Sequence, residues 1–210
     1  MKHFSQEELL TAPSRYRANL INSCTGYKSC NLIATQNQKG ITNVAIFNSV
    51  IHIGSNPPML GFILRPLSVP RHTYANFKEN EYFTVNQVPH NQIEKAHQTA
   101  AKYKEGASEF KATGLKEEYL NNFKAPYVSS SPIKLGCRYL NECVIKENNT
   151  LLIIGGIEEL YIDETIITKD GWVDLTQAET AACIGLDGYA LPELLARFSY
   201  AKPEEPVQKI

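Results

Sequence analysis

The sequence predicts a mainly β fold, in which a small antiparallel barrel carries helices at its periphery. About six segments are rich in apolar, aromatic and β-branched residues, and most are joined by turn sequences typical of hairpins. Helix-forming segments are inserted between the hairpins, a pattern that favours a barrel over a doubly wound sheet. The sequence contains neither G-x-G-x-x-G nor a Walker motif, so it does not support a Rossmann or P-loop site.

The first part of the chain contains a short helix and two predicted strands. Ser5 and Glu8 form a capping box, which predicts a helix that reaches about Leu10. The apolar run over 29–35 and the run that begins at Ile41 and reaches about Ile53 are separated by the turn sequence Asn37-Gln38-Lys39-Gly40. We therefore expect these two strands to form an antiparallel hairpin.

The second of these strands does not alternate cleanly between apolar and polar residues. Asn48 and His52 lie on one predicted face, and Asn43 and Ser49 lie on the other. Polar residues on both faces indicate either an edge strand or a wall that lines a ligand. The turn over 54–58 follows, and the segment 59–65 is then predicted to be a buried strand, because it is nearly all apolar.

The loop after this buried strand brings cationic side chains to the start of a predicted helix. Thr73 is a suitable N-cap for a helix over 74–79, and Arg71 and His72 precede it directly. A helix N-terminus has unpaired N–H groups and a positive dipole end, so it favours a phosphate. An apolar strand beside such a terminus indicates a ligand with a flat hydrophobic body and a phosphate tail. The aromatic run over 81–88 is predicted to be the next strand.

The second half of the chain adds one long hairpin. We expect a helix over 92–103, broken helical turns over 105–123, and strands over 133–145 and 151–162 joined at Asn148-Asn149. Gly155-Gly156 indicates a bulge or a close approach by another backbone. A second capping box at Thr176 could open a short helix, and the segment from 185 to the end is predicted to be an irregular arm.

Composition excludes several classes of function. The net charge of −1 provides no basic field that would attract nucleic acid or anionic lipid. The polar N-terminal segment and the broken apolar runs predict no signal peptide and no membrane span, so we expect a cytoplasmic protein. The five cysteines include no C-x-x-C pair, which predicts reduced thiols and no metal site.

The order of several short motifs resembles the flavin reductase-like family with the FMN-binding split barrel, and within it the flavoredoxin-type branch. These motifs are Asn43-x-Ala45, Pro57-Pro58, Thr73-x-x-Asn76 and Tyr82-Phe83-Thr84-Val85-Asn86. The resemblance covers about residues 25–165 and is densest over 40–88. It implies a single domain over 1–210 with a C-terminal arm over about 185–210, built on a six-stranded Greek-key barrel. It also implies non-covalent FMN and a homodimer whose interface borders the flavin.

The resemblance also implies which residues bind the cofactor. Arg71, His72 and Thr73 match the family's phosphate-binding segment, and Arg65 lies near it at the strand end. Asn48, Ser49 and His52 match the strand and turn that flank the ribityl chain and ring. Charge-assisted bonds to arginine or to helix N–H groups suit a phosphate monoester. No catalytic side chain is expected, because flavin chemistry requires orientation and exclusion of water more than a protein acid or base.

The resemblance implies an oxidoreductase that takes hydride from NADH or NADPH and passes electrons to free flavin, ferric chelates or a protein acceptor. Two alternatives remain open at this point. One is a non-catalytic FMN carrier or sensor, and the other is a split barrel that binds pyridoxal phosphate or haem. From the residues alone, Arg71, His72 and Thr73 also fit an exposed helix start, His52 a hydrogen-bonded barrel histidine, and Asn48 and Ser49 a bulge.

Overall fold

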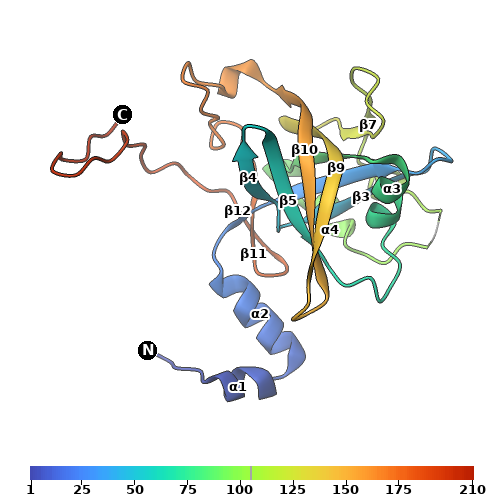
Figure 1. Cartoon of the computed structure of the whole chain (residues 1–210), viewed down its shortest axis with the longest axis horizontal. Coiled ribbons are helices and arrows are strands. Elements are labelled where there is room, and N and C mark those ends of the chain that lie inside the picture. Colours follow the sequence, from blue (N-terminus) through green and yellow to red (C-terminus); the bar gives the residue numbers. More distant parts are fainter. Residues whose placement is uncertain (105) are drawn as a thin grey trace.

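A computed structural model describes residues 1–104 and 106–210 of the chain, and its centre is one large antiparallel sheet (Figure 1). The sheet has seven strands in the order β3-β2-β6-β9-β10-β5-β4. Their bounds are β3 Thr42–Phe47, β2 Asn31–Gln36, β6 Tyr82–Gln87, β9 Ile133–Ile145, β10 Thr150–Ile162, β5 Pro58–Leu64 and β4 Ile51–Ser55. The mainly β class with peripheral helices is confirmed.

The predicted count of six strands was wrong, because the segment 41–53 forms two strands. β3 ends at Phe47 and β4 begins at Ile51, and they lie at opposite edges of the sheet. Their facing ends are at most about 15 Å apart, since four residue steps join them. The sheet must therefore curl until its two edges converge at this corner. It remains an open, split arrangement, because no ladder joins β3 to β4 within the described residues.

Two smaller sheets and several short helices surround the main sheet. One small sheet has the order β1-β11-β12, and the other pairs β7 with β8. Their bounds are β1 Lys28–Ser29, β11 Ala182–Ile184, β12 Gly188–Ala190, β7 Glu117–Glu118 and β8 Tyr127–Val128. The helices are α1 Gln6–Thr11, α2 Ser14–Cys24, α3 His72–Asn80, η1 His90–Gln92, α4 Ile93–Gln98, α5 Glu109–Thr113 and η2 Glu164–Ile166.

Aromatic side chains fill the inside of the curled sheet. Phe62 packs edge-on against Phe77 and Phe83, with ring centroids 6.2 and 5.5 Å apart, and all three are fully buried. Burial of each such side chain stabilises the fold by about 1.5–3 kcal/mol. On the other side of β2 and β3, Leu32 and Val44 pack with Phe110 of α5. These two cores hold α3, α4 and α5 against the β2–β3 edge.

Local sequence signals predicted most of the elements, with several corrections. The Ser5 capping box and the 133–162 hairpin are confirmed, and the ladder shifts register between Ile154 and Gly155, as the glycine pair indicated. The helix predicted over 92–103 is limited to η1 and α4, and Thr176 lies in a turn over residues 175–179 instead of a helix. Of the segment 105–123, residue 105 lies outside the described residues, and the rest holds α5 and β7.

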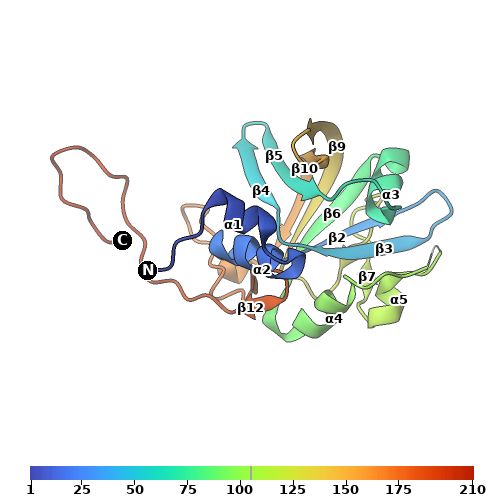
Figure 2. The same cartoon turned by 90° about the horizontal axis from the view of Figure 1, so that it is seen from below.

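Both chain ends lie on one side of the molecule (Figures 1 and 2). In Figure 1 the C-terminal segment extends to the left of the sheet and α1 and α2 lie below it, in the half of the molecule that carries β4. Among the described residues, none of the helices has the length and apolar composition needed to cross a membrane.

Candidate functional site

Two arginines converge beside the N-terminus of α3. Arg71 is the N-cap residue, and no side chain caps the first turn of this helix, so its first N–H groups are available to a ligand. The Arg71 Nε is buried and has no hydrogen-bond partner among residues 1–104 and 106–210. Burial, and next the charge of Arg65, hold the pKa of the Arg71 guanidinium below its ordinary value. Within the described residues neither arginine forms a salt bridge, so the pair favours an anion.

A buried cluster of polar side chains, Asn43, Thr73 and Glu109, connects the start of α3 to β3 and α5. The Asn43 side chain accepts a hydrogen bond from the Thr73 hydroxyl at 3.0 Å and donates to the Glu109 carboxylate at 3.2 Å. The Glu109 carboxylate also accepts from the Val44 N–H at 3.3 Å. Thr73 therefore lies inside the first turn of α3, and its prediction as the N-cap was wrong by two residues. Its hydroxyl fixes the helix to β3.

Glu109 is an unusual member of this cluster, because it is a carboxyl group with only 6% exposure. Burial raises its pKa, while hydrogen bonds from its own N–H and from Val44 and the charge of His72 oppose that rise. His72 therefore lies close enough to interact with Glu109. It is half-buried at the first position of α3.

The corner between β3 and β4 places Asn48 and Ser49 near the same end of β5. The Asn48 side-chain nitrogen donates to the Gly185 carbonyl at 3.1 Å. The Ser49 hydroxyl donates to the Ile63 carbonyl and accepts from the Ile63 N–H, both at 3.1 Å. Ile63 lies two residues before Arg65, so the corner lies near the arginine pair. Ser49 keeps one lone pair for a further partner.

His52 lies away from the arginine pair, at the mouth of a cavity of about 270 Å³. It is exposed on β4 and pairs with Leu60 of β5, which is about 16 Å along the strand from Arg65. The cavity is mainly apolar with a few polar groups, and its lining residues are Ser29, Asn31, Val50, Ile51, His52, Met59, Leu60, Val85, Gln87, Leu135 and Ile157. Such a composition is typical of small-molecule sites.

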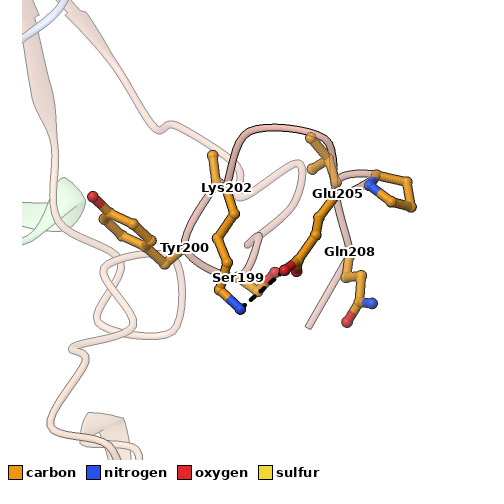
Figure 3. Close-up of a pocket in the computed structure, with 8 residues that line it drawn as sticks. Ser199, Tyr200, Lys202, Glu205 and Gln208 are labelled. Atoms are coloured by element: carbon orange, nitrogen blue, oxygen red, sulfur yellow. Dashed lines mark hydrogen bonds and ion pairs between the residues drawn. The ribbon is translucent and has the colours of Figure 1, made fainter.

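Figure 3 shows a second hollow, of about 250 Å³, which belongs to the C-terminal arm alone. Every residue that lines it lies between Ser199 and Gln208, and Lys202 forms a salt bridge with Glu205 at 3.3 Å within it. No strand of the main sheet contributes to its wall. It is the inside of a chain loop and is not the candidate site.

The structure divides the predicted site residues into three groups. Arg65 and Arg71 lie together, with His72 and Thr73 in the adjoining first turn of α3; Asn48 and Ser49 occupy the corner; and His52 lies at the cavity. Sequence reasoning missed Glu109, because its partner Val44 is 65 residues distant and no local pattern marks its burial. In the described part of the chain, no group of three or more His, Cys, Asp or Glu side chains could hold a metal ion.

Comparison with known proteins adds a family and several relatives. Residues 27–173 match the family described as "Flavin reductase like domain". The crystal structure of a Shewanella frigidimarina protein, described as a flavin reductase with a split barrel domain, is 43% identical, with a TM-score of 0.92. The match covers 96% of this chain and 100% of that one, so it includes more than half of the C-terminal arm.

Two more distant structures share the fold. Nitrilotriacetate monooxygenase component B from Bacillus cereus is 17% identical, with a TM-score of 0.80 over 93% of this chain and 98% of that one. Flavoredoxin of Desulfovibrio vulgaris is 20% identical, with a TM-score of 0.71 over 81% of this chain and 90% of that one. At this level of identity the likeness concerns the fold alone.

Proposed function

The chain belongs to the family of flavin reductase-like domains, and from this membership we propose that it binds FMN non-covalently and acts as an NADH- or NADPH-dependent oxidoreductase. The electrons pass to a small-molecule or protein acceptor, for which free flavin and ferric chelates are the candidates. The family and the flavin reductase relative support the oxidoreductase class. The donor and the acceptor are the new part of the proposal.

One observation carries the choice of a phosphorylated flavin. The buried Arg71 Nε lacks a partner, and Arg71 faces the like charge of Arg65 beside the uncapped start of α3. A buried donor without a partner costs about 1–3 kcal/mol. A phosphate would satisfy the donor, neutralise the paired charges and accept bonds from the first N–H groups of α3. His72 and Thr73 contribute these N–H groups.

The remaining site residues fit the other parts of the cofactor. Asn48 and Ser49 lie between the arginine pair and the cavity, and their polar groups suit the hydroxyls of a ribityl chain. The apolar cavity walls beside His52 suit a flat aromatic ring. The arginines lie past the C-terminal end of β5, and the cavity lies nearer its N-terminal end, beside Leu60. This arrangement suits a ligand with one anionic end and one apolar end.

When bound, FMN supplies the chemistry of hydride acceptance and electron transfer. The chain's own residues bind and orient it, and the apolar walls exclude water. No side chain needs to donate or accept a proton for this role, which agrees with the lack of a predicted catalytic residue. Carriage or sensing without turnover would use the same contacts, and the two are separated by whether a nicotinamide donor bleaches the flavin.

We also propose that residues 1–210 form one domain that assembles as a homodimer with the flavin near the interface. The exposed position of His52 and of the cavity mouth supports this, because a second copy could cover them. A cytoplasmic location is part of the proposal. Its support is that the five cysteines are all free thiols in the described structure.

The test compares FMN with riboflavin, which lacks the phosphate. Arg71→Ala is expected to weaken FMN binding by about 1.5–3 kcal/mol, or roughly 10- to 150-fold in Kd, and to leave riboflavin binding within about twofold. Titration calorimetry or quenching of flavin fluorescence measures both ligands. The control is Arg138→Ala, because this arginine is half-exposed and pairs with Glu81 instead of a ligand.

Equal FMN affinity in wild type and Arg71→Ala would remove Arg71 from the site. A wild-type protein that takes up neither flavin would contradict the proposal as a whole. The absorption spectrum of the purified protein then distinguishes the other ligands, since pyridoxal phosphate and haem absorb differently from flavin.

A further inference from the structure

The predicted C-terminal arm begins within the β11–β12 hairpin, and the arm proper, residues 191–210, leaves the body of the molecule after β12 and projects away from it (Figures 1 and 2). Its apolar side chains have little cover. Tyr200 is 91% exposed and Leu195 is 89% exposed, and Phe198, Val207 and Ile210 are each more than half exposed. An exposed group of this size on one segment indicates a contact that the single chain does not contain.

The arm nevertheless has a defined conformation. Its two limbs are joined by hydrogen bonds from the Ser199 N–H to the Gln208 carbonyl at 3.0 Å and from the Ile210 N–H to the Arg197 carbonyl at 3.1 Å. Arg197 anchors its base, with a salt bridge to Asp170 at 2.6 Å and its guanidinium 4.4 Å from the Trp172 ring centroid. An isolated two-limbed hairpin has little stability in water, so an ordered arm requires further packing.

A second set of uncovered apolar residues lies on the same side of the molecule. These residues are Tyr16 and Ile21 on α2 and Ile51 and Ile53 on β4, and each is between 38% and 50% exposed. β4 is also an edge strand of the main sheet, so one side of its backbone has no ladder partner in the part of the chain that the structure describes. Figures 1 and 2 place α2, β4 and the start of the arm in the same half of the molecule, although in Figure 1 the arm extends to the left and α2 lies below the sheet.

We propose that the arm of each copy packs on α2 and β4 of a second copy, so that two copies exchange arms. A twofold axis on this side brings both uncovered sets together at once, because each chain supplies one arm and one receiving surface. The four aromatic rings of two arms offer about 600–1,000 Å² at about 150–250 Å² each. With the matching area of the receiving surfaces, this reaches the roughly 1,200–2,000 Å² of a stable interface.

The second copy is favoured over an unrelated partner for two reasons. Both uncovered sets belong to this one chain, and reciprocal exchange leaves neither exposed. Most of the arm also lies within the part of the chain shared with the Shewanella structure, although the two sequences are only 43% identical. This inference rests on the proposed homodimer and does not require flavin.

Photocrosslinking tests the contact directly. A benzophenone amino acid replaces Tyr200 in the full chain, and equal amounts of ordinary and ¹⁵N-labelled protein are incubated without FMN until the copies exchange. The expected products join position 200 of one copy to peptides within 14–24 or 51–55 of the other copy, which mass spectrometry identifies by their mixed isotopes. The same probe at Val144, which is exposed at the far hairpin, is the control.

Crosslinks confined to one copy, or between copies at other surfaces, would overturn the proposal. As a second readout, a double variant with Phe198→Asp and Tyr200→Asp should raise the dimer Kd at least about tenfold in sedimentation, since charged groups would enter an apolar contact. Val144→Asp should leave that Kd unchanged. A double variant that dimerises like wild type would also overturn the arm exchange.

These outcomes separate two failures. A wild-type protein that sediments as a monomer contradicts the proposed homodimer itself. A dimer whose crosslinks stay within one copy contradicts the arm exchange alone. Because FMN is absent throughout, neither result depends on whether the flavin site is correct.

Discussion

A half-buried arginine, Arg71, and a buried carboxyl group, Glu109, lie close to the first turn of α3. The Arg71 side chain lies beside Arg65, and its Nε has no hydrogen-bond partner among the described residues. The Glu109 carboxylate accepts hydrogen bonds from the Asn43 side chain and from the Val44 N–H. Burial disfavours the charged form of each, so it lowers the pKa of the arginine and raises that of the carboxyl. The candidate site therefore has an anion-binding position, formed by Arg71 and the N-terminus of α3, close to a carboxyl group that ionises less readily than usual.

Glu109→Gln should stabilise the fold at neutral pH, and the gain should shrink as the pH falls. The unfolded carboxyl ionises near its ordinary pKa of 4.5, and the folded one ionises at higher pH. Between these values the folded state binds more protons, so the wild type loses stability as pH rises while the amide variant does not. Urea unfolding of both proteins across pH 4 to 7 measures this difference.

The control for this experiment is Glu193→Gln, since Glu193 is exposed on the arm. Its difference from wild type should stay flat across the same pH range. If Glu109→Gln also shows a flat difference, or one that grows toward acid, then burial of the carboxyl is not the dominant influence on its pKa.

At the residue scale, the sequence correctly predicted that Arg71 and His72 lie at the start of a helix, because loop and helix signals are local. It could not predict that Thr73 turns inward, since its partner Asn43 is 30 residues distant. It also assigned no partner to Ser49, whose hydroxyl is engaged by the Ile63 backbone. Contacts between distant segments depend on how the strands are ordered, and no spacing in the sequence records that order.

At the scale of elements, the β9–β10 hairpin is organised around its glycine pair. The ladder shifts register at Gly155, and a Cβ atom at this position would lie 2.5 Å from Cζ of the fully buried Phe83. A Cβ atom at Gly156 would instead lie 3.2 Å from a methyl group of Leu140, which is half-exposed and free to move. The two glycines are adjacent in sequence, but position 156 should tolerate a side chain and position 155 should not.

Gly155→Ala is expected to lower the free energy of unfolding by about 1–3 kcal/mol, because the added methyl group overpacks the Phe83 ring. Gly156→Ala is the matched control and should change stability by less than about 0.5 kcal/mol, as a neighbouring exposed side chain can yield. Chemical denaturation of the three proteins compares them. Equal losses for both variants would contradict this account of the bulge.

The elements that the sequence predicted well are those with complete local signals. The 133–162 hairpin has long apolar strands and an Asn-Asn turn, and α1 has its capping box. The segment 41–53 was predicted as one strand, because β-branched and aromatic residues continue on both sides of the corner at residues 48–50 and no Gly or Pro marks it. α2 was not foreseen either. Its N-cap residue, Pro13, makes no side-chain capping bond and the helix buries no residue, so it has neither of the signals that mark α1 or a core helix.

At the scale of the whole molecule, the corner between β3 and β4 determines where the site lies. It joins the two edges of the curled sheet and holds Asn48 and Ser49 next to the end of β5, from which Arg65 follows. The apolar cavity lies farther along β5, beside His52. The arginine pair provides an anion-binding position, the polar corner at Asn48 and Ser49 lies next to it, and the apolar cavity follows. This arrangement explains how a chain without a Rossmann or P-loop motif could bind FMN as proposed.

The most direct test of this account is anaerobic mixing of the FMN-loaded protein with NADH and, separately, with NADPH in a stopped-flow spectrometer. The account predicts that at least one donor rapidly abolishes the flavin absorbance, and that an added acceptor such as a ferric chelate restores it. Flavin that binds but keeps its absorbance with both donors would contradict the oxidoreductase and leave a carrier or sensor.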